Sequence, residues 1–228
     1  MNQTIRGMGL PDPDAVFPNE YGTSCYIKKC GDGPEHPDRG LHLLRRSGGP
    51  CGVLNRTTSC STIRSSGDRL IIGKFCSIAA GTQFIMGPAN HRTSSVSTYP
   101  FQVFGGAWAD QAPPHLGQLP RKGDIMVGND VWIGRESVMP AGGIHIGDGA
   151  IIAARSVVAK DVPAYTVAGG NPVRVLKQRF PEDLVQLLLA WRWWDLPPAE
   201  LAEAVPLLCD PDLDAVRTDL RRRLGMAE

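Results

Sequence analysis

The stretch LIIGKFCSIAAGTQF, residues Leu70–Phe84, carries an aliphatic or aromatic residue at every sixth position. The same spacing returns in VGNDVWIGRESVMP, which begins at Val127, and in IGDGAIIAARSVVAKDVP, which begins at Ile146. The repeated apolar residues are Ile72, Ile78, Phe84, Val127, Ile133, Met139, Ile146, Ile152 and Val158. A short repeat of fixed length is typical of a β-helix, because one repeat buries its apolar side chain only by stacking on the next.

Small residues follow the repeated apolar positions directly. They are Gly73, Ala79, Gly128, Gly134, Gly147 and Ala153. We expect three hexads to form one triangular coil, with the apolar residue inward and the small residue allowing a corner at little steric cost. A one-residue slip at 141–143 predicts a bulge at a corner. A β-sandwich with regularly spaced turns is the alternative, but alternation with a period of two is poor here.

Several of these stretches resemble a known family, the hexapeptide-repeat xenobiotic acetyltransferases, which include streptogramin A (virginiamycin) acetyltransferases and one class of chloramphenicol acetyltransferases. The stretches are Ile71–Ala80, Asn90–Arg92, Ser97–Phe101, Gly128–Gly134, IGDGAIIAARSVV and GGNPVRVLKQRF. The NHR and STYPF motifs, followed by DVWIG, make the resemblance specific, and it extends from about Asp68 to Asp195. It implies an all-β fold, a left-handed parallel β-helix of hexapeptide repeats. This handedness departs from the usual right-handed crossover rule and rests on the resemblance alone.

The chain divides into three parts. Residues 1–66 form an N-terminal arm and an atypical segment, residues 67–171 the β-helix with an excursion loop at 85–124, and residues 172–228 a helical appendage. Apolar residues at three- or four-residue steps from Val173 predict a helix that the sequence Asp-Leu-Pro-Pro, from Asp195, ends. Two further helices are predicted, at Pro198–Leu208 and Asp212–Leu224.

Residues 25–66 show neither the strand period nor the helix period. The segment is poorer in apolar residues than the chain as a whole, which is 42% hydrophobic. We therefore expect it to be poorly ordered, with few contacts to the coil. Members of the family usually carry an aromatic-rich extended segment here, and its loss puts the acceptor pocket in doubt. A lineage-specific insertion and translation in a shifted reading frame both explain the departure.

Bulk properties narrow the function classes. The net charge of the 228 residues is +1, which argues against a general nucleic-acid or membrane-surface binder. The chain contains no run of eighteen apolar residues, so we expect no membrane-spanning helix. The N-terminus lacks an apolar signal core, so we expect cytoplasmic residence. The six cysteines are not spaced as zinc ligands. We expect no metal.

His91, in the motif Asn90-His91-Arg92 of the excursion loop, is the predicted catalytic residue. Acetylation of a hydroxyl requires removal of its proton, and histidine suits this because its unperturbed pKa lies near neutrality. The alternative from the residues alone is a surface histidine without a role. The matching family motif favours catalysis.

Aromatic residues are the candidates for binding the acceptor. The resemblance implies that Trp132 of the DVWIG motif lines the acceptor site. Packing against a neighbouring subunit would also explain a tryptophan at this position. Tyr99, Phe101 and Trp108 share the loop with His91. Tyr99 and Trp108 could line an apolar pocket for a bulky acceptor, whereas Phe101 is expected only to anchor the loop.

The resemblance also suggests where coenzyme A binds. The family threads the pantetheine arm along the coil between two subunits, where the small residues Gly142, Ala153 and Ala154 would let it approach the backbone. The 3′-phosphoadenosine end requires cations, and Arg174 and Lys177 supply them. Arg179 could be a third cation or part of an ordinary solvated helix face.

The predicted function is acetyl-CoA-dependent O-acetylation of a hydroxyl group on a xenobiotic or antibiotic by a homotrimer. Streptogramin A is the first choice of acceptor and chloramphenicol the second. Two other classes stay open. A non-catalytic trimeric β-helix would keep the scaffold with a spoiled acceptor pocket. A zinc carbonic anhydrase, also a left-handed β-helix trimer, would need three histidines, but His91, His115 and His145 contain no close pair.

Overall fold

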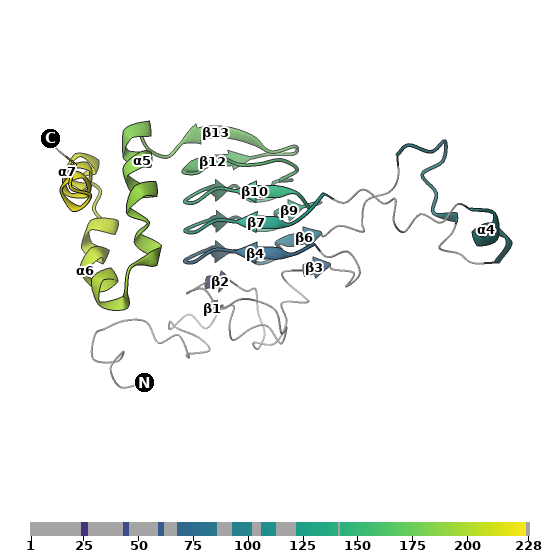
Figure 1. Ribbon diagram of the computed structural model, residues 1–228, viewed down its shortest axis with the longest axis horizontal. Coiled ribbons are helices and arrows are strands. Elements are labelled where there is room, and N and C mark those ends of the chain that lie inside the picture. Colours follow the sequence, from purple (N-terminus) through teal and green to yellow (C-terminus); the bar gives the residue numbers. More distant parts are fainter. Residues whose placement is uncertain are drawn as a thin grey trace.

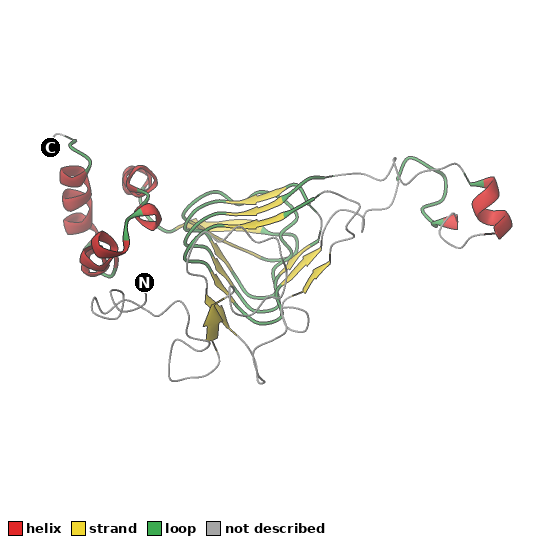
Figure 2. Ribbon diagram, turned by 60° about the horizontal axis from the view of Figure 1, so that its bottom comes forward, coloured by secondary structure: helices red, strands yellow, loops and turns green. Residues whose placement is uncertain are grey.

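Short strands wind into a three-sided coil in the computed structural model, which describes residues 24–26, 43–45, 59–61, 68–85, 93–101, 106–112, 122–140 and 142–226. Successive strands belong to three different sheets, and the cycle then repeats. The strands that follow this order are β4 (Leu70–Ile72), β5 (Ser77–Ile78), β6 (Gln83–Ile85), β7 (Ile125–Val127), β8 (Trp132–Ile133), β9 (Val138–Met139), β10 (Ile144–Ile146) and β11 (Ile151–Ile152). The triangular outline is seen end-on in Figure 2.

Parallel pairing stacks equivalent hexads directly on one another. Ile72 pairs with Val127, which pairs with Ile146, and Ile78, Ile133 and Ile152 align in the same way on the next sheet. Phe84 pairs with Met139 on the third sheet. All nine repeated apolar residues belong to one core inside the coil, eight of them fully buried and Ile72 partly. The six-residue period therefore predicted the core correctly.

The small residues after the apolar positions are explained by close approach between coils. A Cβ atom on Gly73 would lie 2.4 Å from the carbonyl oxygen of Gly128, and one on Gly134 would lie 2.5 Å from the amide nitrogen of Ala154. Neither glycine has a positive φ. The positive φ values occur two residues further on, at Phe75 and Glu136. The small residues therefore keep the steric cost of the corner low, as expected, because they make room for the neighbouring backbone, whereas the left-handed dihedrals fall on the residues two positions further on.

The slip in the repeat lies where it was expected. Gly143 has φ of +72° between β9 and β10. A Cβ on the neighbouring Gly142 would lie 1.9 Å from the carbonyl oxygen of Gly123, so this corner packs against the returning end of the excursion loop. Ala141 lies outside the described residues.

Two strands from the atypical N-terminal segment join the coil. β2 (Leu43–Arg45) pairs in parallel with β5, and β3 (Ser59–Ser61) pairs in parallel with β6. β1 (Ser24–Tyr26) pairs with β2 in the antiparallel sense. At β2 and β3 the expectation of few contacts with the coil is wrong, and the sheets begin before residue 67. The rest of residues 25–66 lies outside the described residues.

The excursion loop leaves the coil after β6 and returns at β7, as predicted. It includes the short helix α4 (Gly106–Gln111), none of whose residues is buried. Figures 1 and 2 show α4 far from the stacked strands, on the side opposite the C-terminal helices. The side chains of α4 therefore lie away from the core of their own chain (Figure 1).

The last turn of the coil differs from the sequence prediction. β12 (Thr166–Gly169) is followed by an antiparallel strand, β13 (Arg174–Gln178), where a helix was expected. The spacing of apolar residues from Val173 fits a helix, but the segment instead pairs as a strand with the open edge of β12. The helix begins only at Glu182.

Helices complete the C-terminal part. They are α5 (Glu182–Trp191), the 3₁₀ turn η4 (Trp193–Asp195), α6 (Pro198–Leu208) and α7 (Leu213–Arg223). The bounds of α6 match the prediction, and Asp212 caps α7 by accepting hydrogen bonds from the amides of Asp214 and Ala215. Leu184, Leu188 and Leu220 form a second core with Tyr165 of the coil. No helix among the described residues is long and apolar enough to cross a membrane.

Candidate functional site

The two groups of predicted acceptor-binding residues lie on different parts of the chain. Trp132 is 53% exposed on β8, on the outer face of the seven-stranded sheet. Tyr99 and Trp108 belong to the excursion loop and are 48% and 55% exposed. No ring contact joins Trp132 to either of them in the described part of the chain. One chain alone therefore does not bring these residues together.

The loop aromatics form a cluster of their own. The ring centroids of Tyr99 and Phe101 lie 4.8 Å apart, those of Phe101 and Trp108 5.5 Å, and those of Tyr99 and Trp108 6.4 Å, all in edge-to-face geometry. Such pairs stabilise a local arrangement beyond simple burial. Phe101 contacts both other rings, as Tyr99 does, so the anchoring role expected of Phe101 alone stays a prediction. His91 lies outside the described residues, as does His115.

An apolar row runs along the outer face of the seven-stranded sheet from Trp132. Ile151 pairs with Trp132, Val167 pairs with Ile151, and Lys177 pairs with Val167. Adjacent strands are about 4.8 Å apart, so Trp132 and Lys177 are separated by roughly 14 Å. The row thus begins at an exposed indole and ends at an ammonium group.

Part of the proposed cofactor set lies close together at the end of the coil. A Cβ on Gly169 would lie 2.9 Å from the Cβ of Ala153, and Gly169 pairs with Arg174. Ala154 is exposed at the same corner. Gly142 lies at a different corner, where packing against Gly123 already accounts for its lack of a side chain.

The three cations near the end of the coil have different surroundings. Arg174 and Lys177 are exposed on β13, and neither has an ion pair or side-chain hydrogen bond to another described residue. Arg179, by contrast, is partly buried. Its Nη1 donates to the carbonyl oxygen of Gly149 at 2.6 Å and lies 3.7 Å from Asp130 Oδ2. Arg179 therefore belongs to neither of the two environments expected of it.

Other reactive groups fit a structural role. Cys76 is 1% exposed and its thiol donates to the carbonyl oxygen of Gly128 at 3.1 Å. Burial raises the pKa of the thiol to about 12, which makes it a poor nucleophile at neutral pH. His145 is exposed, as expected. In the described ranges no three His, Cys, Asp or Glu side chains are grouped so that they could hold a metal ion.

Relatives with known names share most of this chain. A protein named "Probable macrolide acetyltransferase" from Lysinibacillus sphaericus is 48% identical over 143 residues, which are 62% of this chain and 78% of the relative. The chain belongs to the hexapeptide-repeat xenobiotic acetyltransferases. It is an O-acetyltransferase.

Two more members of the family match over similar lengths. A chloramphenicol acetyltransferase from Escherichia coli is 44% identical over 64% of this chain and 69% of its own. A virginiamycin A acetyltransferase from Staphylococcus aureus is 48% identical over 66% of this chain and 68% of its own. No family model matches the chain. A solved galactoside acetyltransferase in complex with coenzyme A is 25% identical over half of each chain, with a TM-score of 0.29.

Proposed function

We propose that this acetyltransferase moves the acetyl group of acetyl-CoA to a hydroxyl group of an antibiotic, with streptogramin A as the first choice of acceptor. Membership in the xenobiotic acetyltransferase family carries the proposal. The 48% identity to a virginiamycin A acetyltransferase supports the choice of acceptor. Chloramphenicol is the second candidate, supported by a relative at 44% identity.

His91 acts as the general base. Its imidazole takes the proton of the acceptor hydroxyl while the hydroxyl oxygen attacks the thioester carbonyl. A backbone N–H stabilises the oxyanion of the tetrahedral intermediate. The intermediate collapses to the acetyl ester, and the departing thiolate takes a proton from the imidazolium. The thiol of Cys76, which is buried and has a raised pKa, is poorly suited to carry the acetyl group as a nucleophile.

Acetyl-CoA lies along the coil, which is proposed to be left-handed. Its pantetheine arm passes the small residues Ala153 and Ala154, with Gly142 offering only backbone. Its 3′-phosphoadenosine end meets Arg174 and Lys177, whose charges have no partner among the described residues. Unpaired exposed cations are well suited to a phosphate, because charge-assisted hydrogen bonds are among the stronger ones.

The acceptor site is assembled between copies in a homotrimer. Two observations support this arrangement. The helix α4 of the excursion loop lies far from its own coil (Figure 1), and Tyr99 and Trp108 of the same loop are exposed. Trp132 is also exposed on the coil and has no aromatic partner among the described residues. A neighbouring copy would bring His91 and the loop aromatics of one chain to Trp132 of the next.

An acetyl-transfer assay tests the proposed function. Purified protein is incubated with acetyl-CoA and, separately, with virginiamycin A, chloramphenicol and a macrolide, and free thiol is measured. We expect acceptor-dependent thiol release with virginiamycin A, and a product heavier by one acetyl group in the mass spectrum. If thiol is released only with chloramphenicol or only with the macrolide, that compound would take the place of streptogramin A as the proposed acceptor. Release with none, by a folded trimer, would favour the non-catalytic alternative.

A further inference from the structure

The strand that carries the two unpaired cations lies at the edge of its sheet. All five residues of β13 are exposed, and β12 is the one described strand that pairs with it. The pairing is interrupted by a register shift between Val167 and Ala168. Arg174 pairs on one side of the shift and Lys177 on the other. The position of Lys177 therefore depends on the C-terminal end of β13.

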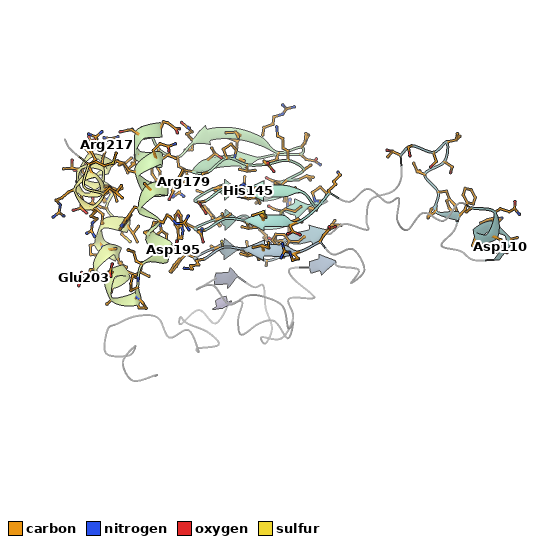
Figure 3. The ribbon with its side chains drawn as sticks, viewed as in Figure 1. Asp110, His145, Arg179, Asp195, Glu203 and Arg217 are labelled. Carbon is orange, nitrogen blue, oxygen red and sulfur yellow. The ribbon has the colours of Figure 1, made fainter. Side chains whose placement is uncertain are left out.

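Arg179 fixes that end. Its amide donates to the carbonyl oxygen of Tyr165 at 2.8 Å, and its guanidinium donates to the carbonyl oxygen of Gly149 at 2.6 Å. The same guanidinium faces the carboxylate of Asp130 at 3.7 Å and lies over the ring of Phe180, 5.0 Å from its centroid. Figure 3 shows Arg179 where the stacked strands meet the helices.

These contacts connect β13 to two earlier turns of the coil. Gly149 lies in the turn between β10 and β11, and Asp130 lies in the turn between β7 and β8. Arginine suits the position, because its planar group donates in several directions at once, whereas a lysine ammonium is a single point charge. Arg179 is two residues from Lys177 in sequence.

We propose that Arg179 is a positioning residue for the cofactor phosphate: it anchors the end of β13 so that Lys177 is held ready for the 3′-phosphate of acetyl-CoA. This inference rests on the proposed role of Lys177. Its physical basis is preorganisation, because a cation that is already held in place loses less freedom when the phosphate binds. In this proposal Arg179 does not contact the cofactor, because its guanidinium already donates to the carbonyl oxygen of Gly149 and faces the carboxylate of Asp130.

The test compares acetyl-CoA with acetyl-3′-dephospho-CoA, which lacks only the phosphate in question. The measured quantity is the preference, the ratio of kcat/KM for the two donors. Lys177→Ala should lower the preference about tenfold or more, the usual effect of losing a charge-assisted contact. Arg179→Met should lower it by most of that factor through KM, with kcat unchanged. The double variant should lose no more than Lys177→Ala alone.

Lys74→Ala is the matched control. Lys74 Nζ pairs with Asp195 at 2.8 Å, so it also joins the coil to the helices, but it contacts η4 and not β13. This variant should lower the melting temperature without changing the preference. Arg179→Lys keeps the charge but loses the planar donor group, and it should give an intermediate preference.

The outcomes separate the two proposals. An unchanged preference in Lys177→Ala would overturn the phosphate role of Lys177, and the inference about Arg179 with it. A lowered preference in Lys177→Ala, with wild-type preference in both Arg179 variants, would overturn the positioning role alone. An equal loss of preference in Lys74→Ala would show a general loosening of the junction and would also contradict the positioning role.

Discussion

Trp132 and Ile133 are neighbours on β8 and face in opposite directions. The indole of Trp132 is 53% exposed, whereas Ile133 is 0% exposed inside the coil. Successive residues of the coil strands thus alternate between the core and the outer surface, as strand geometry requires. The inner residue repeats every six positions because the chain must stack, and the outer residue is free to serve binding.

Replacing His91 with alanine should lower kcat about a hundredfold or more, the usual contribution of a positioned general base. KM for acetyl-CoA should change little, because the base is needed for proton removal and not for donor binding. Steady-state kinetics with virginiamycin A and acetyl-CoA measure both quantities. His145→Ala is the control, since His145 is exposed on β10 and should leave kcat unchanged. Near-normal turnover in His91→Ala would remove His91 from the mechanism.

Replacing Gly128 with alanine should destabilise the coil. The new Cβ would lie 2.7 Å from both the amide nitrogen and a carboxylate oxygen of Asp148, so adjacent turns would have to separate. We expect the free energy of unfolding to fall by about 1–3 kcal/mol, the range for overpacking. Ala79→Gly tests the equivalent hexad position in the opposite direction and should cost about 1 kcal/mol or less. Equal stability of Gly128→Ala and wild type in denaturant titration would refute close approach as the reason for the glycine.

Cys76 and Cys209 should differ in reactivity. Cys76 is buried with its pKa raised to about 12, whereas Cys209 is exposed at the end of α6. A thiol reagent at pH 8 should modify Cys209 rapidly in the native protein and Cys76 only after unfolding. Peptide mass spectrometry at successive times assigns the modified residue. Rapid native labelling of Cys76 would mean that the first turn of the coil opens readily.

Asp130 should make stability depend on pH. Burial raises its pKa above the ordinary value of 3.8, although Arg179 opposes the rise. The folded protein then keeps this proton to a higher pH than the unfolded chain does. The contribution of Asp130 to the free energy of unfolding therefore falls as pH rises from about 3.8 through the raised pKa.

Asp130→Asn removes this term, so its stability relative to wild type should increase with pH across that window. Other titrating groups, including Asp195, are present in both proteins and cancel in the difference. Chemical denaturation of both proteins at a series of pH values measures it. A difference that decreases with rising pH would mean that the ion pair with Arg179 outweighs the cost of burial.

The sequence was a good guide to the interior and a poorer guide to the ends of the coil. Ile78, Ile133 and Ile152 were predicted to point into the coil, and they are buried in its core, because a repeat that must stack buries its apolar residues inside. β13 was predicted as a helix, because apolar spacing near Leu176 does not reveal that β12 offers an open edge. The strands β2 and β3 were missed because the sequence around them, residues 25–66, shows neither the strand period nor the helix period.

The candidate site was predicted from family motifs more than from the physical properties of its residues. Trp132 was recognised through DVWIG and lies exposed on the outer face of the coil, and its binding role stays a prediction. The contacts of Arg179 were missed, because nothing in its local sequence indicates that Gly149 and Asp130, from earlier turns of the coil, come together around it. His91 and its role stay a prediction.

Mixing two inactive variants tests the central claim, a site shared between copies, most directly. His91→Ala and Trp132→Arg should each be inactive as pure trimers. When the two are unfolded together and refolded, some interfaces will combine an intact His91 from one chain with an intact Trp132 from the next. We predict that acetyl transfer to virginiamycin A reappears in the mixture and is absent from each variant refolded alone. A mixture of folded trimers that contain both chains and stay inactive would contradict the shared site.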